Sequence, residues 1–464
     1  MQINSDINWA LVQGDEDLLM AVRNLLTFKS PAAKYSPAFK KKYWDGMVKL
    51  HKVTKEGVLI RSGLVTYVVD KLVALGYPRL DVHYVSKDLE IRDKDLSLLR
   101  FYQQEAVRAV WVYRQGIIVV PTGGGKTWIG LGLLKSFKYK RAVFLLHRQE
   151  LMWQTYDLFK EHFPSVGRVG AGLKEYDHDI VIGMVQTLSS MSKKAKFDPW
   201  FKDVELMVID EAHHAGSTSY QTVVDKCEEL QVKVGMTGSA PEGEDLEALG
   251  VLGMLGGTVY SIPISLLVEL GYVVAPRVTM YRGSWNKKHD KIHEEFDFMK
   301  DGETTRYWTV VRERCLIQNL ERNLLIKELS EGKQGVLVIV DMVEHGRLLS
   351  ELIGCPFSHG GAVDRKGLFT GFRSGKIPIL VASPIMDEGV DIAGIRTVIL
   401  ASGGMSYKRL LQRIGRGMRL QDGKVDVHII DFEDTGVRLL EKHAKARMKV
   451  YKKNDFPISR KDMG

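Results

Sequence analysis

The feature that most constrains how this chain folds is a unit that recurs along most of its 464 residues. Each unit is a short apolar run, then a loop rich in Gly, Thr, Ser or Asp, then a helical pattern. Uninterrupted apolar runs of this length are typical of strands buried on both faces of a parallel sheet. The helical patterns between them predict βαβ connections. The first series comprises "GIIVV" before "PTGGGKT", "RAVFLL" before "HRQEL", "DIVIG" before "MVQTL", "ELMVI" before "DEAHH" and "VKVGM" before "TGSAP".

The same unit returns in the second half of the chain. The runs "GVLVIV", "PILVA", "RTVIL" and "VDVHII" precede "DMVEHG", "SPIMDEGVD", "ASGG" and "DFEDTG". The two series predict two tandem α/β domains with doubly wound parallel sheets, at residues 93–272 and 273–464. Ligands of such sheets bind at the carboxyl ends of the strands, which is where the polar loops fall.

Residues 1–92 do not follow this rhythm and predict a small, separate α+β domain. Residues 29–61 contain nine lysines and arginines but only two acids, with aromatic residues interleaved. Basic side chains neutralise nucleic-acid phosphates, so Lys40, Lys41, Lys42 and Trp44 are candidate nucleic-acid contacts. An aromatic core beneath a solvated lysine face is the alternative, and both can hold together. A second basic segment, residues 438–461, predicts either an auxiliary DNA contact or a solvated closing helix.

The overall composition narrows the class of protein. The net charge of +9 favours a polyanionic partner without requiring one. Three widely spaced cysteines exclude a disulfide framework and indicate a reducing compartment. The acidic N-terminal stretch is unlike a signal peptide, and glycines and a proline interrupt the longest uncharged run, residues 248–268. We expect a cytoplasmic protein with no membrane partner.

The stretch "VVPTGGGKTW" predicts a phosphate-binding loop between a strand and a helix. Glycines let backbone N–H groups converge on phosphate oxygens, and the helix N-terminus adds partial positive charge. Lys126 can reach the β- and γ-phosphates of ATP, and Thr127 can hold Mg²⁺. Val120 stands where the usual GxxxxGK[ST] pattern has its first glycine. The predicted nucleotide contacts are Thr122, Gly123, Gly124, Gly125, Lys126 and Thr127.

Two adjacent acids follow the run "ELMVI". Asp210 is predicted to coordinate Mg²⁺, and Glu211 to orient and deprotonate the attacking water. The alternative, an acidic turn that caps a helix, is disfavoured by the glycine loop earlier in the same domain. The spacing of His213 and His214 is wrong for a two-histidine metal site on a helix, and His214 is predicted to be a surface or packing residue.

The stretch "QRIGRGMR" holds three arginines and no acid, which indicates an anionic partner. Arg416 and Arg419, three residues apart, can lie side by side on one helical face. Arginines placed in this way stabilise the charge that builds on a leaving γ-phosphoryl group. A nucleic-acid backbone is the alternative partner, for Arg413 in particular.

Taken in order, these motifs resemble those of the superfamily 2 helicases over about residues 98–435. "LRFYQQEAV" resembles their adenine-reading glutamine motif. "PTGGGKT", "HRQEL", "MVQTL", "DEAH" and "TGSAP" resemble motifs I, Ia, Ib, II and III, and "VLVIVD", "SPIMDEGVD" and "QRIGRGMR" resemble motifs IV, V and VI. The resemblance implies two tandem RecA-like domains that hydrolyse ATP with Mg²⁺.

The resemblance also implies roles for single residues. Gln103 would read the adenine, Gly389 would approach the γ-phosphate and Asp391 the ribose, and Gln412 would help to place the phosphate or water. Arg148, Thr187 and Ser383 would contact the nucleic-acid backbone. The chain departs from the family at Met184 and Ser383, where threonine is common, and at Ser239 and Ala240 in motif III. These departures bear on strand contacts and on coupling, and leave the ATPase residues intact.

The N-terminal stretch that contains "KKKYWDG" resembles the accessory domain of the phage UvsW-like helicases, which remodel forks and migrate branched DNA. We therefore expect an ATP-dependent DNA helicase, acting as a monomer on forks, junctions and single strands in replication, recombination or repair. An RNA helicase, a translocating subunit of a restriction complex, and a nucleic-acid-activated ATPase switch that displaces no strand remain alternatives.

Overall fold

The structure, a computed structural model, describes residues 2–30, 33, 36–85, 90–121, 123–241, 243–273, 275–284, 304–362, 364–383, 395–404, 426–453 and 456–462. The chain divides into two units, residues 1–120 with 125–262, and residues 121–124 with 263–464. The first unit contains both the N-terminal sheet and the first parallel sheet. The three-domain division at residues 92 and 272 therefore stays a prediction.

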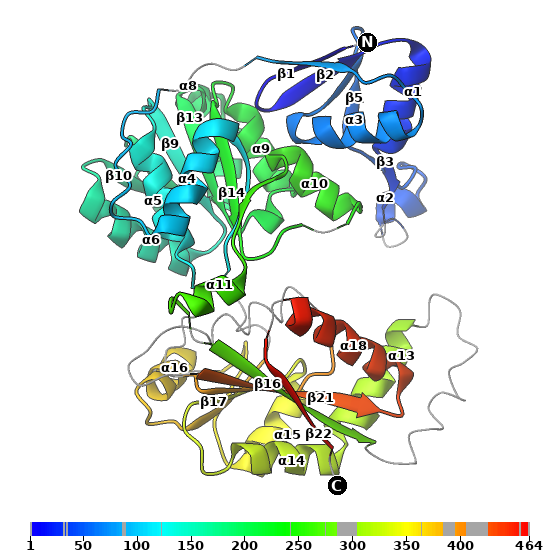
Figure 1. The fold of residues 1–464 in the computed structure, drawn as a ribbon, viewed down its shortest axis with the longest axis vertical. Helices are drawn as coiled ribbons and strands as arrows, with labels where there is room; N and C mark the ends of the chain where they lie inside the picture. Colours follow the sequence, from blue (N-terminus) through cyan, green and yellow to red (C-terminus); the bar gives the residue numbers. More distant parts are fainter. Residues whose placement is uncertain are drawn as a thin grey trace. The chain divides into compact units, whose positions relative to one another are not determined.

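The N-terminal part of the first unit is an α+β fold around a five-stranded sheet in the order β5-β6-β2-β1-β7 (Figure 1). Its strand pairs are antiparallel except β1 with β7. Asp15 caps α1 by accepting a hydrogen bond from the backbone N–H of Leu18 at 2.9 Å. The elements are β1 (Gln2–Ser5), β2 (Trp9–Gln13), α1 (Glu16–Leu25), β3 (Thr27–Lys29), α2 (Pro37–Lys40), β4 (Met47–Lys49), β5 (His51–Val53), β6 (Val58–Arg61), η2 (Ser62–Leu64), α3 (Val65–Ala74) and β7 (Asp81–Tyr84).

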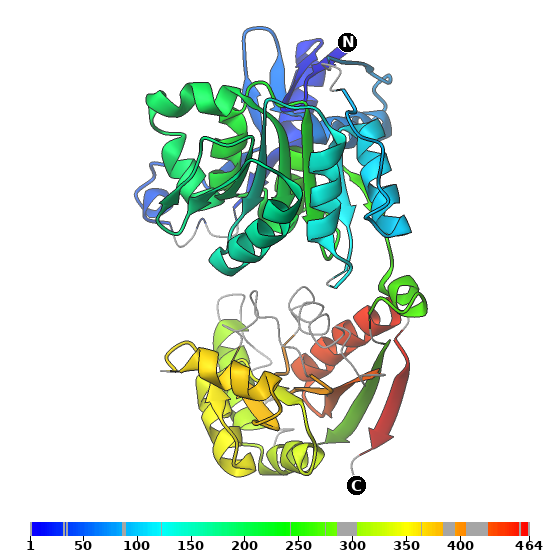
Figure 2. The same cartoon turned by 90° about the vertical axis from the view of Figure 1, so that its left-hand side faces the viewer.

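The first parallel sheet has eight strands in the order β11-β10-β12-β9-β13-β14-β8-β15, with helices on both faces (Figure 2). Only β10 with β11 is antiparallel among its pairs. Its strands are β8 (Gln115–Val119), β9 (Arg141–Leu146), β10 (Val166–Gly170), β11 (Leu173–Lys174), β12 (Ile180–Met184), β13 (Val204–Asp210), β14 (Val232–Thr237) and β15 (Thr258–Ser261). Its helices are α4 (Phe101–Tyr113), α5 (Lys126–Ser136), α6 (Gln149–His162), α7 (Val185–Met191), η3 (Ala195–Phe197), α8 (Asp198–Lys202), η4 (Ala212–His214), α9 (Thr218–Lys226) and α10 (Leu246–Leu255).

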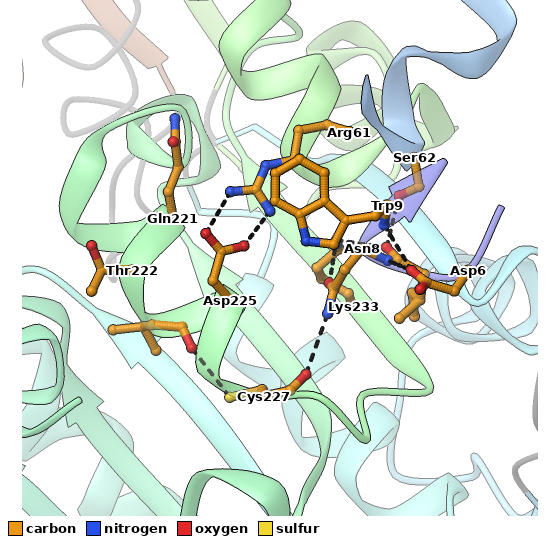
Figure 3. Close-up of polar contacts among 12 residues, drawn as sticks. Asp6, Asn8, Trp9, Arg61, Ser62, Gln221, Thr222, Asp225, Cys227 and Lys233 are labelled. Carbon is orange, nitrogen blue, oxygen red and sulfur yellow. Dashed lines mark hydrogen bonds and ion pairs between the residues drawn. The ribbon is translucent and has the colours of Figure 1, made fainter. Parts of the chain in front are cut away.

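An arginine joins the N-terminal part to the first parallel-sheet domain. Arg61, at the end of β6, donates from both terminal nitrogens to the two carboxylate oxygens of Asp225 on α9, at 2.5 and 3.0 Å. Its guanidinium also lies 3.9 Å from the ring centre of Trp9. Figure 3 shows the carboxylate facing this guanidinium beside the indole. A bidentate pair has a fixed geometry, so it sets the orientation of the two parts.

A fully buried lysine lies at the same junction. Lys233 on β14 is 0% exposed, and its Nζ donates to the Ile7 carbonyl at 2.7 Å and to Asn8 Oδ1 at 3.0 Å. Asn8 Nδ2 in turn donates to the Cys227 carbonyl at 3.3 Å. Burial, reinforced by the charge of Arg61, lowers the pKa of Lys233 to about 7. The junction is thus a buried polar contact as well as an apolar one.

Backbone also approaches backbone across this junction. A Cβ atom added to Gly63 in η2 would lie 2.0 Å from the Leu252 carbonyl oxygen of α10. Leu249 of α10 belongs to the hydrophobic cluster of the N-terminal part. The core of the N-terminal part is therefore completed by a helix of the neighbouring domain.

The second unit holds a seven-stranded parallel sheet in the order β18-β19-β17-β20-β21-β16-β22. Its strands are β16 (Ala275–Ser284), β17 (Val336–Ile339), β18 (Phe357–Ser358), β19 (Ile379–Ala382), β20 (Thr397–Leu400), β21 (Asp426–Thr435) and β22 (Ile458–Asp462). Its helices are α11 (Ile264–Glu269), α13 (Thr304–Val311), the π-helix η6 (Arg312–Ile317), α14 (Leu320–Ser330), α15 (Val343–Ile353), α16 (Arg365–Arg373) and α18 (Arg438–Lys453). The two doubly wound parallel sheets predicted from the sequence are confirmed.

The basic segment 438–461 forms α18 and most of β22. Arg447 of α18 is 4% exposed and donates from Nε to Asp431 Oδ2 at 2.9 Å, and Tyr451 donates its hydroxyl to the same oxygen. The predicted closing helix is present, but it is only partly solvated because Arg447 and Tyr451 are buried, and a DNA contact through its exposed lysines stays a prediction. Within the described ranges no helix is long and apolar enough to cross a membrane.

Candidate active site

The glycine loop leads from β8 into α5. Gly123 and Gly125 adopt positive φ angles of 87° and 75°, a conformation that glycine takes without strain. Gly125 is the residue before the helix, so Lys126 and Thr127 form the first turn of α5. The Nζ of Lys126 donates to the Val120 carbonyl at 3.3 Å. The helix N-terminus and the lysine therefore face the end of the strand, as phosphate binding requires.

Gln103 connects this loop to α4. It is 3% exposed; its Oε1 accepts from the Arg100 backbone N–H at 2.9 Å and its Nε2 donates to the Gly125 carbonyl at 3.4 Å. The side chain thus lies beside the phosphate loop, with its amide turned toward the backbone. Its contact with the adenine stays a prediction.

Asp210 and Glu211 lie at the carboxyl end of β13. Asp210 is 8% exposed, and its Oδ1 accepts from the Glu211 backbone N–H at 2.9 Å. Burial and the neighbouring Glu211 charge raise the pKa of Asp210 to about 6. Burial alone would also raise the pKa of Glu211, but the positive charges of Lys126, His213 and Arg148 hold that pKa below its ordinary value. Lys126 is therefore close enough to both acids to act in one site with them.

These residues fit a magnesium ion. Asp210 is a buried carboxylate whose raised pKa reflects burial beside another acid, and a cation bound there would stabilise its charged form. Carboxylate and hydroxyl oxygens are the ligands that Mg²⁺ prefers. Asp210 and Thr127 would hold the ion, with phosphate oxygens and water completing its shell.

Glu211 has an unusual backbone. Its φ and ψ are 51° and 52°, in the left-handed region, where a residue other than glycine carries roughly 1–2 kcal/mol of strain. Strain of this kind persists where surrounding contacts fix the residue. It aims the Glu211 side chain away from the direction that a regular strand would give it.

Three histidines and an arginine gather beside Glu211, which the sequence did not predict. Arg148 Nε donates to His147 Nε2 at 2.8 Å. The His147 ring lies 4.8 Å from that of His214, and the His214 ring lies 4.1 Å from that of His213. His213 Nδ1 lies 3.4 Å from Glu211 Oε2. His214 is exposed, in line with its prediction as a surface or packing residue, and its ring contacts those of His147 in motif Ia and His213 in motif II.

The candidate nucleic-acid contacts of the two parallel-sheet domains lie next to several different elements. Arg148 precedes α6 and Thr187 lies in the first turn of α7, both after the carboxyl ends of parallel strands. Ser383 follows β19 and is 2% exposed, and its hydroxyl finds no hydrogen-bond partner within the described ranges. A contact from Ser383 to a nucleic-acid backbone stays a prediction.

The candidate contacts of the N-terminal part lie at the end of α2 and on the turn that follows it, a segment here called the basic turn, Lys40–Tyr43. Lys40, Lys41 and Lys42 are exposed, and Tyr43 is 83% exposed. Trp44 is half-buried instead.

The indole Nε1 of Trp44 donates to the Met47 carbonyl at 2.9 Å, and its ring meets Phe39 edge-on at 6.5 Å. Aromatic packing therefore lies beside an exposed lysine face, and contact of these residues with nucleic acid stays a prediction.

Six predicted nucleotide-site residues lie outside the described ranges. Their roles stay predictions. They are Thr122, Gly389, Asp391, Gln412, Arg416 and Arg419.

Two family models match the chain. Residues 97–242 match the family described as "Type III restriction enzyme, res subunit", and residues 317–421 match "Helicase conserved C-terminal domain". The chain is also 24% identical over 465 residues to the "ATP-dependent DNA helicase uvsW" of Enterobacteria phage T4, covering 93% of this chain and 89% of that protein. The chain belongs to the superfamily 2 helicases. It is related to UvsW, and ATP hydrolysis is the reaction of its family.

Other relatives of this helicase are longer. The ATP-dependent helicase IRC3 of Saccharomyces cerevisiae is 26% identical over 367 residues, which cover 72% of this chain and 51% of the yeast protein. This helicase therefore spans about half the length of that relative. Among solved structures, the helicase domain of Pyrococcus furiosus Hef matches with a TM-score of 0.51 at 16% identity, covering 77% of this chain and 100% of that one. The restriction-modification enzyme LlaBIII bound to DNA matches with a TM-score of 0.57 at 13% identity, covering 86% and 36%. Both share the tandem RecA-like fold.

Proposed function

We propose that this helicase is an ATP-driven DNA translocase that unwinds or branch-migrates forked and junction DNA. The observation that carries the proposal is the basic turn, three exposed lysines and an exposed tyrosine on a domain that is docked firmly on the first RecA-like domain. The names of UvsW and of the "DNA 3'-5' helicase XPB" of Kineococcus radiotolerans, 22% identical over 386 residues, favour DNA over RNA.

The ATPase part of the proposal assigns one task to each residue. Lys126 and the glycine-loop N–H groups bind the phosphates. Thr127 and Asp210 would hold Mg²⁺, which would neutralise phosphate charge. Glu211 orients the attacking water and accepts its proton, a role that suits a carboxylate held ionised by nearby positive charge. Arg416 and Arg419 stabilise the charge that develops on the γ-phosphoryl group.

The basic turn provides a second nucleic-acid-binding site in addition to the one on the RecA-like domains. Phosphate contacts from lysines are independent of sequence, and an exposed aromatic ring can stack on an unpaired base. Two linked sites raise the effective concentration of DNA at the second site, so branched DNA gains most. Branch migration suits such a motor, because re-formed base pairs offset broken ones and the net free-energy change is near zero.

One alternative is an RNA helicase, because the chain is 24% identical over 412 residues to a protein of Acanthamoeba polyphaga mimivirus named as a putative ATP-dependent RNA helicase. An ATPase switch that displaces no strand is a further alternative. ATP-dependent unwinding of forks, four-way junctions, D-loops and RNA duplexes separates the three. We expect displacement on forks and junctions; displacement on RNA alone, or ATP turnover with no displacement, would contradict the proposal.

The role of the basic turn is tested by reversing Lys40, Lys41 and Lys42 to Glu. We expect weaker junction binding with a shallower salt dependence, while single-strand affinity changes little. The matched control reverses the exposed lysines 193, 194 and 196, which makes the same change in net charge elsewhere. An unchanged ratio of junction to single-strand affinity would assign junction preference to the RecA-like domains.

A further inference from the structure

Three histidine rings form a continuous path between Arg148, a predicted nucleic-acid contact, and Glu211, the predicted catalytic base. We propose that His147 is a positioning residue that couples strand binding at Arg148 to hydrolysis at Glu211, through His214 and His213. We call His147, His214 and His213 the histidine relay. The inference rests on the proposed function, because it requires a nucleic-acid strand at Arg148.

The fold brings the two ends of the relay together. Strands β9 and β13 are parallel neighbours with Leu145 opposite Ile209. His147 and Glu211 each follow these partners by two residues, so the chain leaves the sheet side by side at both positions. The loop after β9, which carries His147 and Arg148 of motif Ia, therefore lies beside the loop after β13, which carries Glu211.

At the nucleic-acid end of the histidine relay, Arg148 Nε donates a hydrogen bond to His147 Nε2 at 2.8 Å. Since Nε2 accepts this bond, the ring carries its proton on Nδ1, and its orientation is tied to the guanidinium. A guanidinium has five N–H donors, and a bidentate phosphate contact uses two of them. Binding of a backbone phosphate can therefore fix Arg148 while the bond to His147 is kept.

The catalytic end of the relay is the contact of His213 Nδ1 with Glu211 Oε2 at 3.4 Å. His213 and His214 lie in η4, directly after Glu211, and their rings are 4.1 Å apart. The His147 ring meets His214 at 4.8 Å and 66°, an edge-on arrangement that aromatic rings favour. A shift of the His147 ring is therefore passed to the exposed His214 ring, and from it to the His213 ring that contacts the base.

A small displacement matters at this position. Glu211 is held in the left-handed region, so its direction depends on its neighbours and not on a relaxed backbone. A misplacement of about 1 Å at a reacting group can cost roughly a hundredfold in rate. The histidine relay thus gives a bound nucleic-acid strand a physical route to stimulate ATP turnover.

Two substitutions of His147 separate its two contacts. His147→Phe keeps a ring against His214 and removes the acceptor for Arg148, whereas His147→Gln keeps an acceptor and removes the ring. We expect each to lower the stimulation of ATP turnover by saturating single-stranded DNA at least tenfold. The matched control is His359→Phe, since His359 also accepts an N–H, from Gly361 at 3.1 Å, and makes a ring contact, with Phe357 at 4.9 Å.

The readout is the ratio of stimulated to basal turnover, with nucleotide affinity and melting temperature measured alongside it. If DNA stimulates the ATP turnover of His147→Phe to within twofold of the unmodified protein, the histidine relay is overturned and the proposed function stands. An equal fall in basal and stimulated turnover would assign His147 a purely structural role and overturn it too. If no nucleic acid stimulates the unmodified protein, the proposed function fails and the relay fails with it.

A double-substitution cycle completes the test. If Arg148 acts through His147, Arg148→Gln combined with His147→Phe lowers stimulation no further than Arg148→Gln alone. Independent effects would multiply instead, which would overturn the relay.

Discussion

The buried Lys233 predicts that the stability of the first unit rises with pH near neutrality. The pKa of Lys233 is about 7 in the folded protein, against an ordinary value of 10.5. Between these two values the unfolded chain binds more protons than the folded one, so the free energy of unfolding increases with pH. The charges of Arg61, Asp6 and Asp225 and the thiol of Cys227 also act on this amine.

The size of the effect follows from the two pKa values. From pH 7 to pH 8.5 the folded lysine loses its remaining proton while the unfolded lysine keeps its own, which adds on the order of 1–2 kcal/mol to the free energy of unfolding. A neutral amine still has two N–H groups, so the bonds to Ile7 and Asn8 survive deprotonation. The junction is therefore expected to tighten, and not to open, as the lysine discharges.

The assay is urea denaturation of the full chain at pH 7.0 and pH 8.5, followed by circular dichroism. Lys233→Met removes the titrating group, and Lys193→Met is the control, since Lys193 is an exposed lysine. The unmodified protein and the control should gain on the order of 1–2 kcal/mol over this range relative to Lys233→Met. Equal pH dependence in all three proteins would refute a discharged, buried lysine at the junction.

The remaining predictions concern the active site and the docking contact. Lys126→Ala should abolish ATP turnover and weaken nucleotide binding, whereas Glu211→Gln should bind ATP and hydrolyse it at least a hundredfold more slowly; near-normal turnover in Glu211→Gln excludes it as the base. Arg419→Ala should bind nucleotide almost normally and lose about 10³ in turnover with saturating DNA; lost DNA affinity with intact basal turnover indicates a backbone contact instead. Gly63→Ala should destabilise the first unit by about 1–3 kcal/mol in urea, while Gly257→Ala, which meets nothing within 4 Å, should not; equal stability of the two contradicts the close approach to α10.

Continuous apolar runs predicted their strands well. Each of the nine runs that precede polar loops is a strand of a parallel sheet, because a strand buried on both faces needs apolar side chains at most positions. The strands that the sequence did not indicate are of a different kind. Glycines interrupt β10, and β22 is an edge strand of sequence "ISRKD" with four exposed residues. Edge strands carry charged side chains that face water, which hides them from any search for apolar runs.

The site was predictable where it depends on strand ends and not where it depends on strand order. Lys126, Asp210 and Glu211 each follow an apolar run, and all parallel strands end at one edge. The contact of His147 with His214 depends on β9 lying beside β13, and βαβ rhythm alone does not specify neighbours. Gln103 was assigned to the adenine, and its bonds to backbone atoms required coordinates.

The contribution of α10 to the N-terminal core has a consequence for synthesis of the protein. Leu249 packs with side chains that are made within the first 85 residues, yet it leaves the ribosome more than 150 residues later. At about 5–20 residues per second the N-terminal sheet waits on the order of 10–30 s for the helix that completes its core. During that interval its apolar face has no cover from α10. The N-terminal part is therefore expected to mature only after the first RecA-like domain has emerged, and to be the segment most dependent on protection while translation proceeds.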